Sequence, residues 1–206
     1  MPKIIDGNKQ ILTSGYGTGL STKQKTAVNI IQTPFINIGQ TWGAGAIGTG
    51  EAPIAFRQTD AINGLIITEV QIDLTGLKAK GGDAGDVIGL GTKPAFIYKN
   101  EVANNGIIFK HEVLCTEVPA STSGTITTDI NVAWAEAATI DFDEAGGTGS
   151  EINTGGLVAG QVVQDLTAAI TANHYAYLTE GDTAASTGTY TSGQLIYRMY
   201  GYKVRG

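Results

Sequence analysis

The stretch that decides the fold is GLIITEVQIDLT, residues 64–75. From Glu69 onward it alternates strictly: one side carries Val70, Ile72 and Leu74, and the other carries Glu69, Gln71 and Asp73. Because successive side chains of a β-strand point to opposite faces, this pattern predicts a strand with one buried and one wetted side. One-sided burial is typical of antiparallel sheets rather than of parallel sheets covered on both faces.

The rest of the chain repeats this signal. We count eight to ten strand-like runs, separated by turns that the 29 glycines help to form. Residues 107–118 are apolar on both sides, which predicts a covered strand. Residues 125–134 alternate, with Asp129 and Asn131 expected on the outer side. The sequence therefore predicts an all-β protein, an antiparallel β-sandwich or jelly-roll-like barrel.

The length fits one all-β domain or two small ones, and we expect one, over residues 25–206. Residues 1–24 are rich in glycine and poor in apolar residues, so we expect an extended N-terminal arm; a loosely ordered terminus is the alternative. Pro34 interrupts the apolar run 27–38, which favours an edge strand or two short strands. At most one short helix is expected, over residues 162–170, although Val162 and Val163 also suit a strand.

Charge and composition exclude several classes of function. The net charge is -6 and the 13 basic residues form no cluster, so we expect no nucleic-acid partner. Cys115 is the only cysteine, which excludes an internal disulfide and a thiolate zinc site. No run approaches the roughly 18 apolar residues of a membrane span, and residues 1–6 lack the apolar run of a secretory signal. We expect a protein made in a cytoplasm, with no membrane partner.

Two motifs resemble ligand sites without meeting the requirements of one. Gly43–Gly48 matches G-x-G-x-x-G, but a helix must follow that motif and Pro53 comes soon after it. Asp141–Gly146 resembles the start of an EF-hand loop, yet the twelfth position is Ile152 instead of a glutamate. A solvated turn is the expected structure there, and calcium bound by the acidic run is the alternative.

We expect no enzymatic activity, no cofactor and no metal. His111 and Cys115 are four residues apart, which in a strand separates them by about 13 Å and prevents a Cys–His pair. With two histidines a three-histidine metal site is impossible, and G-x-S-x-G is absent. Paired carboxylates for glycoside cleavage remain open.

Tyrosines concentrate near the C-terminus, at positions 175, 177, 190, 197, 200 and 202. They fit either half-buried positions in terminal strands or a surface that binds sugar or protein.

The same region carries a family resemblance, in ITANHYAYLTEGD (170–182), GTY (188–190) and LIYRMYGY (195–202). These stretches, together with the glycine- and threonine-rich, acidic, nearly cysteine-free composition, resemble small virion proteins of marine tailed phages. The resemblance implies a non-enzymatic capsid decoration (cement) protein on the virion surface, trimeric and bound to the major capsid protein. We expect the N-terminal arm to contact that partner through Ile4, Ile5, Ile11, Leu12 and Tyr16, because such an arm can become ordered on binding.

Two other functions remain open from the sequence. One is a carbohydrate-binding β-sandwich for host attachment, which would need an exposed aromatic platform such as Trp42 beside tyrosines. The other is a tail or connector protein of the virion, which would form rings or tubes in isolation.

Overall fold

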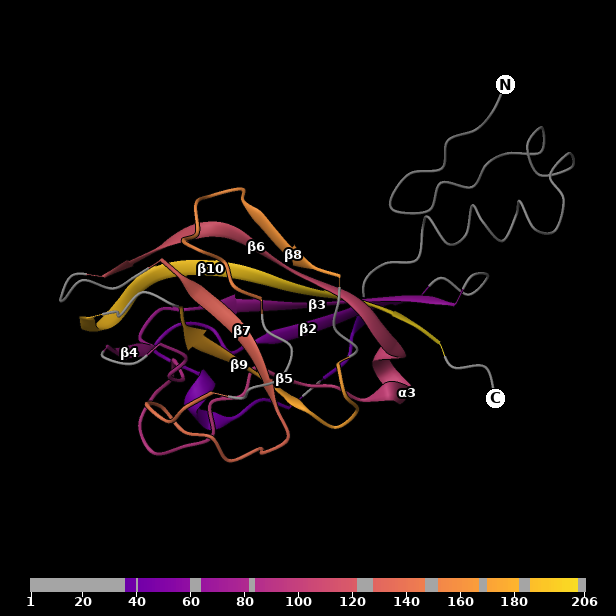
Figure 1. The fold of residues 1–206 in the computed structure, drawn as a ribbon, viewed down its shortest axis with the longest axis horizontal. Helices are drawn as coiled ribbons and strands as arrows, with labels where there is room; N and C mark the ends of the chain where they lie inside the picture. Colours follow the sequence, from indigo (N-terminus) through magenta and orange to yellow (C-terminus); the bar gives the residue numbers. More distant parts are fainter. Residues whose placement is uncertain are drawn as a thin grey trace, which may run out of the picture.

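Two antiparallel β-sheets packed against each other make up the fold (Figure 1). The computed structural model describes residues 36–39, 41–59, 64–81, 84–121, 128–146, 152–166, 170–181 and 186–203. The expected fold class, an antiparallel β-sandwich, is confirmed. The expected arm, residues 1–24, lies outside the described residues.

The larger sheet has seven strands in the order β1-β2-β3-β10-β6-β8, with β4 paired to one end of β10; the smaller sheet has the order β5-β9-β7. The strands are β1 (Ile36–Asn37), β2 (Ile54–Thr59), β3 (Leu65–Asp73), β4 (Lys78–Gly81), β5 (Tyr98–Lys99), β6 (Ile107–Ser121), β7 (Ile130–Ala135), β8 (Val162–Asp165), β9 (Tyr175–Glu180) and β10 (Ser186–Tyr202). Helical structure in the described residues consists of a 3-10 turn, η1 (Ala44–Ala46), and one turn of α-helix, α3 (Val102–Asn105).

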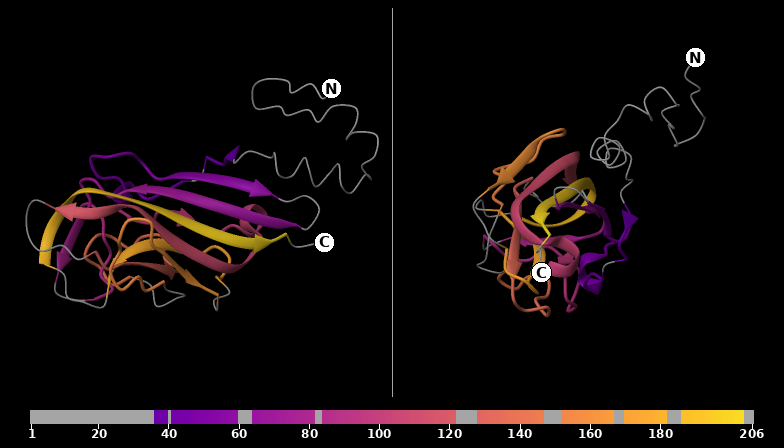
Figure 2. Two further views of the ribbon diagram at one scale, coloured as in Figure 1. Left: turned by 90° about the horizontal axis from the view of Figure 1, so that it is seen from above. Right: turned by 90° about the vertical axis from the view of Figure 1, so that its right-hand side faces the viewer.

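Strand β10 is the spine of the large sheet, because it pairs with β3 on one side and with β6 on the other. Figure 2 shows it running along the length of the molecule. The pairing with β6 shifts register between Tyr190 and Leu195. Gly193 lies in this irregular stretch with φ +133, and a Cβ there would come within 2.9 Å of Pro119 and Leu74. The bulge therefore requires glycine at this position.

The alternation of residues 69–74 is confirmed. Val70, Ile72 and Leu74 are each at most 3% exposed to solvent, whereas Gln71 is exposed. These three side chains join one core cluster with residues of the small sheet, among them Val132 and Leu178. The polar side of β3 faces away from the small sheet, and we call the surface on that side of the large sheet the outer face.

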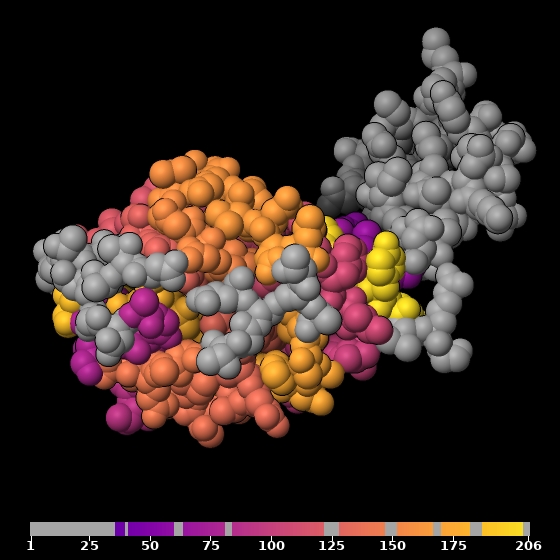
Figure 3. All heavy atoms as spheres, viewed as in Figure 1, coloured from indigo at the N-terminus to yellow at the C-terminus, as the bar shows by residue number. Residues whose placement is uncertain are grey.

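The helix expected over residues 162–170 is wrong. Val162–Asp165 form β8, which pairs with β6 so that Val163 faces Val113. Two consecutive β-branched residues fit a pleated strand better than a helix, and the edge of β6 supplies the backbone partners. Strand β8 and the chain before it lie at the surface, in the orange region of Figure 3.

The expectation that Asp129 and Asn131 point outward is also wrong, because both are buried. The loop around Thr154 covers this side of β7. The Asn131 Oδ1 atom accepts a hydrogen bond from Thr154 N at 3.0 Å, and Asp129 Oδ1 accepts one from Gly155 N at 3.0 Å. A loop distant in sequence therefore converts a polar side of the strand into a buried, hydrogen-bonded one.

Strand β1 lies at an edge of the large sheet. Residues 27–35, the rest of the run expected to form an edge strand, lie outside the described residues. Within the ranges that the structure describes, no helix is long and apolar enough to span a membrane.

Candidate functional site

The partner-contacting residues expected from the sequence, Ile4, Ile5, Ile11, Leu12 and Tyr16, all lie outside the described residues. In the described part of the chain, we consider the outer face as the candidate binding surface. It contains three features: a charged row at its centre, an apolar patch at the end of the sheet near Tyr202, and a groove at the other end of β3.

The charged row runs across three neighbouring strands. The strand registers place Arg198 of β10 between Glu69 of β3 and Glu112 of β6. Arg198 Nε donates to Glu69 Oε1 at 2.6 Å, and its Nη1 donates to Glu112 Oε1 at 2.7 Å. Lys110 Nζ lies 2.7 Å from Glu112 Oε2, and the Tyr200 hydroxyl donates to Glu112 Oε1 at 2.8 Å. Every oxygen of the Glu112 carboxylate therefore has a donor.

Burial and hydrogen bonding act in opposite directions on these groups. Burial by itself would raise the pKa of Glu112, but hydrogen bonds from Lys110, Tyr200 and Arg198 lower it below its ordinary value. Burial would likewise lower the pKa of Arg198, whereas its hydrogen bonds to Tyr200, Glu69 and Glu112 raise it. The hydrogen bonds therefore favour the charged forms of Glu112 and Arg198. The row contains two acids, Glu69 and Glu112, and two bases, Lys110 and Arg198, so its formal charges cancel. The centre of the outer face carries no net charge that would repel an approaching surface.

An exposed apolar patch adjoins this neutral row. Ile107 and Phe109 of β6 and Tyr202 of β10 are 58%, 38% and 53% exposed. The rings of Phe109 and Tyr202 stack, with centroids 4.8 Å apart and planes inclined by 18°. Stacking fixes both rings before any partner binds. Contiguous exposed apolar side chains of this kind mark interaction surfaces.

The C-terminal tyrosines do not form one surface. Tyr177, Tyr190 and Tyr197 are completely buried, Tyr175 and Tyr200 are partly buried, and Tyr202 is exposed. Two of the six tyrosines, Tyr175 and Tyr200, are therefore half-buried. Tyr202, and the exposed part of Tyr200, are available to a binding surface.

The groove has a volume of about 350 Å³ and opens on the outer face between β2, β3 and β10. Isoleucines form its floor and polar side chains its rim. The lining residues are Glu51, Ala52, Ile54, Gln71, Ile72, Asp73, Thr116, Gln194, Leu195 and Ile196.

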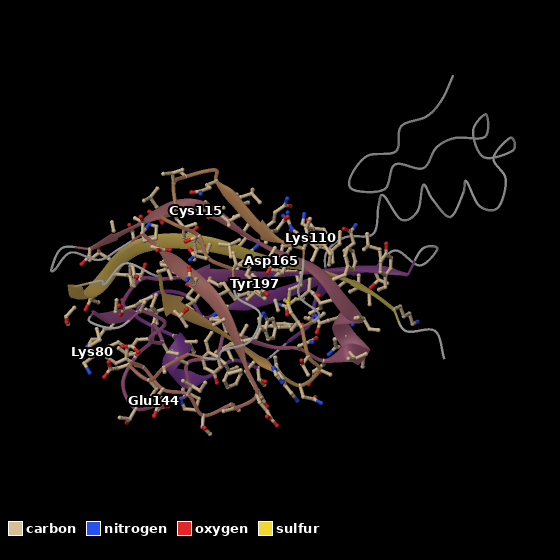
Figure 4. The ribbon with its side chains drawn as sticks, in the orientation of Figure 1. Lys80, Lys110, Cys115, Glu144, Asp165 and Tyr197 are labelled. Atoms are coloured by element: carbon tan, nitrogen blue, oxygen red, sulfur yellow. The ribbon has the colours of Figure 1, made fainter. Side chains whose placement is uncertain are left out.

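A chain of polar groups crosses the core and superficially resembles a catalytic set. Trp134 Nε1 donates to the Tyr197 hydroxyl at 3.0 Å, and that hydroxyl lies 2.8 Å from His111 Nδ1. When the hydroxyl donates its own hydrogen to Nδ1, the imidazole proton resides on Nε2. Nε2 lies 3.7 Å from Asp165 Oδ2. Figure 4 shows Tyr197 and Asp165 near each other in the upper part of the molecule.

This row of hydrogen-bonded groups is inaccessible to a substrate, because His111 and Tyr197 have no exposed surface. Burial raises the pKa of Tyr197 well above 10, which keeps the hydroxyl protonated and able to donate. Burial also lowers the pKa of His111, although Asp165 opposes this change. The imidazole is therefore neutral in the folded protein at pH 7 and joins the two sheets through Tyr197 and Trp134.

We expect this histidine to make stability depend on pH. Below about pH 6.5 the unfolded chain protonates the imidazole while the folded chain does not, so the free energy of unfolding falls as the pH drops from 6.5 towards 5. His111→Gln, which retains an acceptor for Tyr197 but does not titrate, should flatten this decline. Urea denaturation at pH 7.5 and 5.0 measures it. An equal decline in both proteins would show that His111 titrates normally when folded.

Two other sequence candidates, the glycine motif and the His111–Cys115 pair, find ordinary structural roles. Gly43 and Gly45 flank the start of η1 and pack on the carbonyls of Lys93 and Pro94, where a Cβ would come within about 2 Å of an oxygen. Close backbone contact explains these glycines. His111 and Cys115 are both buried on the same strand, β6, as expected.

The acidic run after residue 140 is held by protein groups. Glu144 Oε2 accepts from the backbone N–H of Asp141 at 2.8 Å, and Asp143 forms an ion pair with Lys80. Lys80 and Glu144 lie at the end of the molecule opposite to Lys110 (Figure 4). Among the residues with described positions, no three histidine, cysteine, aspartate or glutamate side chains gather as they would around a metal ion.

Comparison of the chain with family models, with curated proteins and with solved structures finds no match.

Sequence reasoning missed both the charged row and the groove. Arg198 is a single cation in an otherwise apolar and aromatic run, LIYRMYGY, and this was the available signal. A cation within a strand points to a nearby carboxylate. The identity of that carboxylate depends on strand register, which the sequence does not reveal.

Proposed function

We propose that this chain is a non-enzymatic structural protein of a tailed-phage virion, a capsid decoration protein that binds the major capsid shell as a homotrimer. The observation that carries the binding role is the apolar patch of Ile107, Phe109 and Tyr202 beside the neutralised charged row. The assignment to a virion rests on the resemblance of the C-terminal stretches.

The physical role of such a protein is mechanical. Each copy that binds across neighbouring shell subunits adds buried interface, and a stable interface needs about 1,600 Å² in total. A stacked aromatic pair is suited to anchor such a contact, because its side chains lose little freedom on binding. The N-terminal arm, with Ile4, Leu12 and Tyr16, adds contact area in this proposal.

Cosedimentation with shells of the major capsid protein tests the role. We expect Ile107→Asp to weaken binding at least about tenfold, because it places a charge in the apolar contact. Val158→Asp is the matched control, since Val158 is 61% exposed and lies beyond the opposite end of the β6–β8 pairing. Deletion of residues 1–24 should abolish binding while circular dichroism still reports a folded β protein. Full binding by both Ile107→Asp and the deletion variant would contradict the proposal.

A further inference from the structure

The groove on the outer face has a negative rim over an apolar floor. Asp73 Oδ1 accepts from Thr75 N at 2.9 Å and Oδ2 from Glu51 N at 3.0 Å. Partial burial would raise the pKa of Asp73, but the hydrogen bonds from Thr75 and Glu51 lower it, so this carboxylate is ionised. The exposed Glu51 side chain lies on the same rim. Ile54 and Ile196 line the space between the polar groups.

A third carboxylate extends the negative charge across the sheet. Gln194 of β10 lies opposite Asp73 on one side and opposite Glu117 on the other. In the described part of the chain, no lysine, arginine or histidine forms an ion pair with Glu51, Asp73 or Glu117. The charged row nearby differs, because each of its carboxylates has a cation. The groove therefore suits a ligand that presents cations beside apolar side chains.

The chain itself contains a segment of this chemistry. Residues 1–35 hold four lysines and one acidic residue, a net charge of +3. The whole chain has a net charge of -6, so residues 36–206 have a net charge of -9. In an extended conformation Lys3, Ile5, Gly7, Lys9 and Ile11 share one face, because side chains alternate along a strand. That face places isoleucines beside lysines, which matches an isoleucine floor beside carboxylates.

We propose that the N-terminal segment, residues 3–11, docks in this groove, on its own copy or on a neighbouring one. The segment has sufficient reach. Ile36, the first described residue, pairs with Arg57 of β2. Arg57 is three residues from the groove residue Ile54, which is about 10 Å along the strand. Residues 12–35 can span up to about 80 Å when extended. Docking leaves the opposite face, with Ile4, Leu12 and Tyr16, free for another partner, and the inference stands independently of the shell.

Photo-crosslinking within the full chain tests the proposal. Gly7 lies on the face expected to dock and Asn8 on the other, so p-benzoylphenylalanine is introduced at each position separately. We expect the probe at position 7 to crosslink to residues 51–54, 71–73 or 194–196, identified by mass spectrometry. The probe at position 8 should give at least about fivefold less of these products. Crosslinks from position 7 that map elsewhere, or equal yields at both positions, would overturn the docking.

Charge exchange establishes whether the rim recognises the lysines. With the probe at position 7, the double substitution Lys3→Glu and Lys9→Glu should remove most of the groove crosslink, and Glu51→Lys with Glu117→Lys should restore it. The control pair for the rim, Glu136→Lys with Glu144→Lys, makes the same charge change on exposed acids away from the groove and should restore nothing. Equal recovery with either pair would show that net charge, and not the groove, holds the segment. Failure of shell binding with an intact groove crosslink would affect only the virion proposal.

Discussion

Replacing Arg198 with leucine is expected to lower the free energy of unfolding by about 3–5 kcal/mol at pH 7. The guanidinium bridges Glu69 and Glu112, and the Glu112 side chain is only 6% exposed. Without the cation, the carboxylates of Glu69 on β3 and Glu112 on β6, the two strands that flank β10, lose the positive charge between them and have little access to water. Chemical denaturation of the two proteins measures the difference.

Two matched variants define what this result means. Arg198→Lys should recover part of the loss, because one ammonium cannot form the paired contacts that a planar guanidinium makes with two carboxylates. Lys93→Leu removes an exposed lysine and should change stability by no more than about 0.5 kcal/mol. A loss below about 1 kcal/mol for Arg198→Leu would show that the row behaves as ordinary solvent-screened surface pairs.

Ile72→Asp is expected to prevent folding altogether. Ile72 is 3% exposed and belongs to the core cluster shared by the two sheets. A carboxylate at this position must be buried without a partner or be protonated, and either cost approaches the 5–15 kcal/mol that stabilises a typical domain. Circular dichroism and the dispersion of amide resonances in a proton NMR spectrum report whether the fold is present.

Gln71→Asp is the matched control one residue away. Gln71 is exposed on the outer face, so the same new carboxylate meets water there, and we expect a loss within about 1 kcal/mol because Asp73 is close. Equal tolerance of both substitutions would contradict the side assignment of β3, since a one-residue shift in register exchanges its two faces.

Sequence patterns predicted the elements whose burial is decided locally. Strand β3 is an example, because its alternation of apolar and polar residues identifies both the element and its buried side. The same reasoning failed for Asn131 on β7, where a loop 23 residues away covers the polar side and bonds to it. It also failed over residues 162–170, where the edge of β6 determines that Val162–Asp165 is a strand. The periodicity of a segment indicates which secondary structures it can form. Contacts with segments distant in sequence determine which of these structures forms and which side is buried.

The candidate site was less accessible to sequence reasoning than the fold. The charged row combines residues as far apart as Glu69 and Arg198, which are 129 positions apart. The groove combines residues from β2, β3, β6 and β10. Neither the charged row nor the groove can be recognised before the strand order and register are known. The isolated position of Arg198 in an apolar strand was a signal for a nearby carboxylate, but it does not identify which one.

We propose that this protein covers a viral shell with its outer face and arm, as a trimer. Mass photometry of the purified full chain, alone and with shells of the major capsid protein encoded by the same genome, tests this directly. We predict a particle of three times the 21.4 kDa chain mass that adds to the shells until their sites are filled. A monomer that leaves the shells unchanged would contradict the claim and favour the carbohydrate-binding alternative.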